Sequence, residues 1–114
     1  MLRHDPQVTL RQMRDAALTA LGFVDGRTRT DLDLDPMLEF ALVRALELIG
    51  EGASRIPDDV RAEAPGIRWA QIVGLRNRLI HGYDSVDLDV VWAVVATDVP
   101  DLVAQLNRLI GSGP

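Results

Sequence analysis

Residues 69–83 read WAQIVGLRNRLIHGY, and this stretch predicts the helix around which the rest of the chain folds. Apolar residues recur three and four positions apart, as on one face of a helix: Trp69, Ile72, Val73 and Ile80. Arg76 and Asn77 fall within the same face, where a charge or an amide costs free energy unless it is paired or solvated. A strong helical pattern interrupted in this way indicates a functional site or an interface.

The end of this helix gathers residue types that carry chemistry. The helix is expected to span about residues 67–81, with Gly82 just beyond it, where a positive φ is often required. His81 is one of two histidines in the chain, and Tyr83 is the only tyrosine. The functional site is therefore predicted to lie in this stretch.

Two Asp–Pro pairs predict the starts of the first two helices. Asp5–Pro6 and Asp35–Pro36 each place a capping carboxylate before a proline, which suits the first helical position. The first helix is expected to end near Gly22, and the second to close with Gly50-Glu51-Gly52. Between them, residues 26–34 show no helical stripe and are predicted to form a polar connection.

The remaining segments also favour helices. One turn is expected within Asp58–Ala64, and Asp87 is a predicted cap of a later helix. Residues 90–95, VVWAVV, have high strand propensity, but a single strand among helices would have no pairing partner. Asp98-Val99-Pro100 is expected to break or kink the chain before a last helix. The prediction is one domain over residues 1–114, an all-α bundle of four or five helices.

Composition excludes several classes of function. The 114 residues include no cysteine, so neither disulfides nor thiolate zinc sites are available. No apolar run approaches the roughly 18 residues that span a bilayer, and no signal peptide is evident, so a soluble cytoplasmic protein is expected. The histidines and acids show no metal-ligand spacing, and no cofactor motif is present. The net charge of −5 disfavours broad nucleic-acid binding, although residues 55–78 hold five arginines and three acids.

Arg76 and His81 together suit cleavage of RNA without a metal. Attack of a 2′-hydroxyl on the adjacent phosphate needs a proton acceptor, a proton donor and a group that stabilises the charged transition state. His81 would transfer a proton and Arg76 would stabilise the charge. Five residues apart, they lie about 140° apart around a helix, and His4 is in a terminal segment. A complete site is therefore expected to need two chains, related by a two-fold axis at the face that carries both residues.

Several segments, taken together, resemble the HepT-like toxins of the HEPN superfamily of all-α ribonucleases. Residues 76–83, RNRLIHGY, resemble the family's Arg-x4-His-x-Tyr signature. The other similar segments are ELIGE at 47–51, PGIRW at 65–69, the stretch from Ser85 to Trp92, and VPDL at 99–102. The resemblance covers most of residues 36–110, and the ordered set is more specific than the Arg–His pair alone.

The resemblance implies a homodimer with a composite cleft, metal-independent RNA cleavage and a toxin–antitoxin pair. Arg76 and His81 would be catalytic, with Asn77 and Glu51 in supporting roles. The implied antitoxin is a minimal nucleotidyltransferase, which in some pairs of the family adenylylates the tyrosine of the signature, here Tyr83. An AMP group there would add bulk and negative charge two residues from His81 and so repel an RNA phosphate.

A rim of arginines is the predicted RNA contact surface: Arg55, Arg68 and Arg78. Other interpretations stay open at this point. In these alternatives Arg76 is a salt-bridge partner of Glu51 or of another acid of the bundle, His81 is a C-terminal cap, and Tyr83 is a core or interface tyrosine. The whole chain would then be a non-catalytic partner of a nucleotidyltransferase, or a dimeric binding module with a degenerate site.

Overall fold

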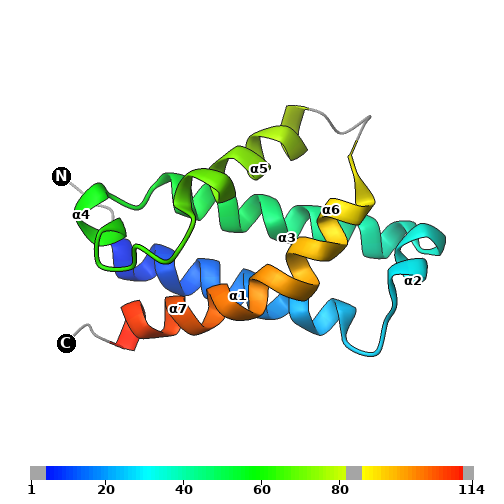
Figure 1. The fold of residues 1–114 in the computed structure, drawn as a ribbon, viewed down its shortest axis with the longest axis horizontal. Coiled ribbons are helices and arrows are strands. Elements are labelled where there is room, and N and C mark those ends of the chain that lie inside the picture. The colour runs from blue at the N-terminus through cyan, green and yellow to red at the C-terminus, as the bar shows by residue number, and fades with distance from the viewer. Residues whose placement is uncertain (1–4, 82–85, 112–114) are drawn as a thin grey trace.

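Helices make up every regular element in the computed structural model, which describes residues 5–81 and 86–111. The elements are α1 (Pro6–Val24), α2 (Arg29–Leu34), α3 (Pro36–Ser54), α4 (Asp58–Arg61), α5 (Trp69–His81), α6 (Leu88–Ala93), the π-helix η2 (Val94–Asp98) and α7 (Val99–Gly111). Figure 1 shows α1 and α3 side by side along the long axis, with α7 against α1 and α5 against α3. The prediction of an all-α bundle is confirmed, and the motif helix begins at Trp69 rather than near residue 67.

Three aspartates cap helix N-termini as predicted. Each carboxylate accepts a backbone N–H of the first turn: Asp5 from Gln7 at 2.9 Å, Asp35 from Met37 at 3.0 Å, and Asp87 from Asp89 at 2.9 Å. The Arg27 guanidinium also donates to Asp35 at 3.1 Å, and this bond, followed by the one from Leu38 N–H, lowers the pKa of Asp35. These caps satisfy otherwise orphaned donors and fix where the helices begin.

The polar connection predicted for residues 26–34 is wrong from residue 29 onward, because Arg29–Leu34 forms α2. Thr28 N–H donates to the Asp31 carboxylate at 2.7 Å, as one half of a capping box. Leu32 is the buried residue of this helix. A helix of six residues is too short to display an apolar stripe, so periodicity alone could not reveal it.

The second helix continues past the glycines at which it was expected to close. Gly50 and Gly52 are both buried within α3, which runs on to Ser54. Neither has a positive φ; among the described residues only Gly26 does. A Cβ at Gly52 would overlap the Met13 side chain of α1, so this glycine permits close helix packing rather than a stop.

A break or a kink was expected at Asp98-Val99-Pro100, and the chain does not break there. Residues 88–111 form one continuous helical run in which the π-turn η2 joins α6 to α7. Pro100 lies at the second position of α7, directly after this turn. A π-turn shifts the hydrogen-bonding register, and this allows the chain to pass a residue that has no N–H.

Helix α3 is the centre of the fold because α1 and α5 pack on different sides of it. Its apolar positions, with those of α1 and α7, supply most of the buried core: Leu10, Met13, Ala17, Leu42, Leu46, Ile49, Val99, Leu106 and Leu109. No helix in the described part of the chain has the length and apolarity required to span a membrane. The fold thus presents α5, the motif helix, on a rigid support.

Candidate active site

Helix α5 approaches α3 most closely at Gly50. A Cβ built at this glycine would overlap Arg76 Cβ and would lie 2.9 Å from Arg76 Cγ and 3.1 Å from the Ile72 carbonyl oxygen. The absence of a side chain at Gly50 is what allows the stem of Arg76 to rest directly on α3. The sequence predicted a helix end at Gly50, and its role as the contact point for Arg76 was not predicted.

The Arg76 side chain is held in place by packing and by one hydrogen bond. Its Nη1 donates to the Asn77 side-chain oxygen at 2.9 Å, and its Nε is buried without a hydrogen-bond partner. Within the described residues, no acid forms an ion pair with it. The proposed pairing of Arg76 with Glu51 is therefore not observed.

The apolar face of α5 is rotated from the one that the sequence suggested. Trp69 and Leu79 are its buried residues, whereas Ile80 is 37% exposed. Asn77 and His81 are also exposed. Arg76 is partly buried and lies at the margin of the face that packs on α3. The arginine that interrupts the apolar pattern therefore stands at the boundary between the contact with α3 and the solvent-facing side of α5.

Two further predicted site residues lie near the end of α3. Glu51 is half-buried and follows Gly50 in the chain, so it lies beside the point at which α5 rests on α3. Arg55 is the exposed C-cap residue of α3. No ion pair between these two residues is found, although their spacing would allow one on a helix.

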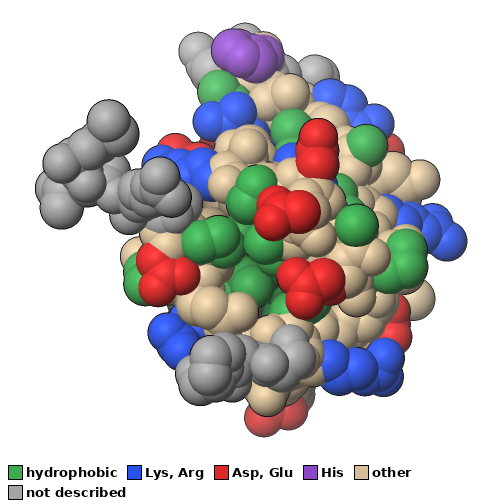
Figure 2. Space-filling view, turned by 90° about the vertical axis from the view of Figure 1, so that its left-hand side faces the viewer, with side chains coloured by type: hydrophobic (Ala, Val, Ile, Leu, Met, Phe, Trp, Pro, Cys, Tyr) green, Lys and Arg blue, Asp and Glu red, His purple; other side chains and the backbone are tan. Residues whose placement is uncertain are grey.

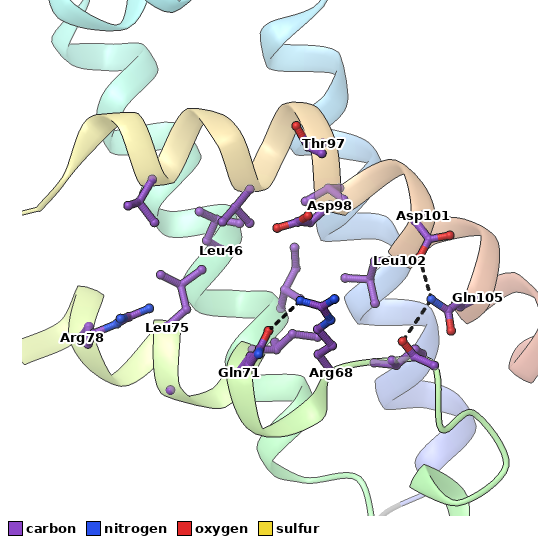
Figure 3. A pocket seen from close by; sticks show the side chains of 18 residues that line it. Leu46, Arg68, Gln71, Leu75, Arg78, Thr97, Asp98, Asp101, Leu102 and Gln105 are labelled. Carbon is purple, nitrogen blue, oxygen red and sulfur yellow. Dashed lines mark hydrogen bonds between the residues drawn. The ribbon is translucent and has the colours of Figure 1, made fainter.

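Two of the three predicted rim arginines line one cleft. This cleft, which we name the α5–α7 cleft, has a volume of about 700 Å³ and opens between α5 and the run η2–α7. Arg68 and Arg78 lie on its α5 side, and Asp98 and Asp101 lie on the other (Figure 3). Arg55 is not part of its lining. All three arginines are exposed, so exposure does not distinguish them. Their positions relative to the cleft do.

The face of the molecule shown in Figure 2 carries no continuous basic surface. On the end of the bundle that carries α4, acidic side chains lie among hydrophobic ones and arginines lie toward the periphery (Figure 2). Among residues 5–81 and 86–111, no cluster of three or more histidines and acids is placed to hold a metal ion.

Comparison with known proteins decides the family. The sequence pattern described as "Ribonuclease HepT-like" matches residues 4–109. The chain belongs to the HepT-like ribonuclease family. It is 33% identical to the Methanocaldococcus jannaschii protein named "Putative RNase MJ1380" over 94% of this chain and 98% of that one. It is 39% identical to the "Probable ribonuclease HepT" of Thermococcus cleftensis over 69% of this chain and 72% of that one.

Membership of the HepT-like family confirms the resemblance drawn from the motif segments. No solved structure gives a significant match to the chain. The predicted modification site of this HepT-like chain, Tyr83, lies outside the described residues, as does Gly82. The geometry available for a mechanism is therefore that of Arg76, Asn77 and His81 on α5, of Gly50 and Glu51 on α3, and of the adjoining cleft.

Proposed function

We propose that this HepT-like protein is a metal-independent ribonuclease, with Arg76 and His81 as catalytic residues. The observation that carries the proposal is that the Arg76 side chain is held in place while its charge has no acidic partner among the described residues. Its stem is packed against α3 and its Nη1 is fixed by Asn77, yet no carboxylate among the described residues neutralises it. An oriented, unneutralised guanidinium beside solvent suits a phosphate, which it can contact through two donors.

The reaction follows from these groups. The ribose 2′-oxygen bonds to phosphorus while the bond from phosphorus to the 5′-oxygen breaks, which leaves a 2′,3′-cyclic phosphate and a 5′-hydroxyl. One group accepts the 2′-hydroxyl proton and another donates a proton to the leaving oxygen. His81, exposed at the end of α5, fills one of these roles. Arg76 stabilises the negative charge that builds up on the phosphate.

We expect cleavage of a labelled RNA to proceed at the same rate in excess EDTA and in magnesium buffer, because neither catalytic group is a metal ligand. The products should carry 2′,3′-cyclic phosphate ends. An RNA with a 2′-deoxyribose at the cleavage site serves as the control and should resist cleavage there. Restoration of an EDTA-inhibited activity by a divalent cation would contradict the proposal.

The proposed site is completed by a second copy of the chain. Helix α5 is unbroken from Arg76 to His81, so their five-residue spacing keeps them about 140° apart. The solvent face of α3 is unusually apolar: Met37 is 81% exposed and Phe40 is 73% exposed, with Leu48 further along the same side. Exposed apolar side chains in such a row favour a protein interface. Together with exposed Ile80 on α5, this row supports a two-fold contact near the motif helix.

We expect Phe40→Asp to convert a dimer to a folded monomer and to reduce cleavage by about 100-fold, because half of the acid–base pair is removed. Light scattering and a cleavage assay at the same protein concentration measure both effects. Leu18→Asp, at an exposed apolar position of α1, is the matched control and should remain dimeric. A wild-type protein that is monomeric at micromolar concentration would contradict the composite site.

The proposed partner is a nucleotidyltransferase antitoxin that adds AMP to Tyr83. The family membership of the chain supports this pairing, and the position of Tyr83 two residues after His81 gives it a physical basis. Co-expression with such an enzyme should add AMP-sized mass increments to the wild type and none to Tyr83→Phe. Unmodified protein that is nevertheless inactive in the presence of the partner would argue against modification as the means of neutralisation.

A further inference from the structure

The α5–α7 cleft is an open cleft that is large enough to hold a small molecule. Its volume of about 700 Å³ lies within the usual range of roughly 300–1,000 Å³ for ligand pockets. Aliphatic side chains form its floor: Leu46, Ile49, Ile72 and Leu102. A flat, partly apolar group such as a nucleobase could rest on this floor.

The two walls of the cleft carry opposite charges that do not neutralise one another. Arg78 on α5 and Asp98 on η2 form no hydrogen bond or ion pair within the described residues. Figure 3 shows the Asp98 carboxylate turned into the space between the walls. Asp101, by contrast, accepts a hydrogen bond from Gln105 at 2.7 Å. Within the described residues, the cleft thus offers two arginines without an ion pair on one side, Arg68 and Arg78, and the Asp98 carboxylate without one on the other.

A nucleotide is the ligand that satisfies both walls at once. Its phosphate can contact the Arg78 guanidinium, and the N–H donors on the edge of its base can reach the Asp98 carboxylate. A simple anion would leave the carboxylate and the apolar floor unused. A simple cation would leave the arginine unused.

The cleft also adjoins the proposed catalytic histidine. Arg78 and His81 are three residues apart on α5, a spacing that places side chains next to each other on one side of a helix. An RNA strand whose cleaved phosphate lies at His81 would therefore bring a neighbouring nucleotide to Arg78 and to the mouth of the cleft.

We infer that the α5–α7 cleft binds the nucleotide next to the cleaved phosphate and that Asp98 selects guanine there. This inference rests on the proposed ribonuclease function. Guanine presents two adjacent donors, N1–H and the N2 amino group, to the two oxygens of a carboxylate. Uracil presents one N–H between two carbonyl oxygens, which the carboxylate repels. Arg78 contacts phosphate and so contributes affinity without base preference.

The first experiment compares cleavage of four short RNAs that differ only in the base next to the cleaved bond. The wild type should favour guanine by about tenfold in kcat/KM, since one paired base contact gives discrimination of this order. Asp98→Asn replaces an acceptor with a donor and should bring the four rates to within about twofold of one another. Arg78→Ala should raise KM for all four alike. Asp59→Asn, an exposed acid of α4 outside the cleft, is the control and should keep the preference.

The second experiment needs no catalysis and uses guanosine 5′-monophosphate as the probe. Titration into the protein should shift the backbone amide NMR signals of Gln71, Arg78 and Asp98, with a weaker effect from uridine 5′-monophosphate. Binding without RNA cleavage would refute the ribonuclease proposal and leave the nucleotide site standing. Equal binding of both nucleotides, or an unchanged base preference in Asp98→Asn, would overturn the inference. The inference would also be overturned if Arg78→Ala changed the oligomeric state and neither nucleotide shifted any signal. The cleft would then be a contact between chains.

Discussion

Arg76→Met and His81→Ala should each lower the rate of RNA cleavage by about 100- to 10,000-fold, the range found for loss of charge stabilisation or of acid–base catalysis. Methionine keeps an unbranched apolar stem against α3 at Gly50 while it removes the guanidinium. Purified variants assayed on the same labelled RNA in EDTA, with melting temperatures measured in parallel, test this expectation.

The stability of Arg76→Met distinguishes a functional arginine from a structural one. Arg76 Nε is buried without a partner, and such a group costs about 1–3 kcal/mol. The variant should therefore melt at the wild-type temperature or above it. Arg76→Lys should also be poorly active, because an ammonium lacks the planar fork that contacts both phosphate and Asn77. Arg108→Ala, an exposed arginine of α7, is the control for loss of charge. Cleavage by Arg76→Met within tenfold of wild type would remove Arg76 from the mechanism.

Gly50→Ala is the second change for which we expect a large effect. The added methyl group would overlap Arg76 Cβ and would lie 3.1 Å from the Ile72 carbonyl oxygen. Neither neighbour is the free end of a flexible side chain, so α5 must move away from α3. A displacement of about 1 Å at a catalytic group can cost about 100-fold in rate. We therefore expect cleavage to fall by about that factor.

Substitutions at two other glycines distinguish an effect on the position of Arg76 from an effect on the stability of the fold. Overpacking costs about 1–3 kcal/mol, against about 1 kcal/mol gained from the helix propensity of alanine. Gly52→Ala creates the same kind of overlap with Met13 of α1 and should lower the melting temperature without changing the activity of the folded protein. Gly22→Ala, which meets no atom within 4 Å, should be neutral or stabilising. If Gly50→Ala and Gly52→Ala lose activity only in proportion to their unfolded fractions, Gly50 has no role in positioning Arg76.

The sequence revealed the features that are encoded over a few neighbouring residues. The aspartate caps at Asp5, Asp35 and Asp87 were predictable because a cap acts within its own first turn. The motif helix was predictable because its apolar spacing repeats along one segment. The short helix α2 was missed, since it depends on one capping interaction and one buried leucine.

The sequence by itself determined that this chain is an all-α member of the HepT-like ribonuclease family with Arg76 and His81 on one helix. Only the tertiary structure decided how that helix is supported. Gly50 was indistinguishable from a helix-ending glycine until α5 was seen to lie against it. Arg68 and Arg78 differ from Arg55 because they line a cleft whose other wall is formed by η2 and α7. The physical reason is the same in each case: close approach and shared enclosure depend on which element lies opposite a residue, and residues adjacent in sequence carry no record of that.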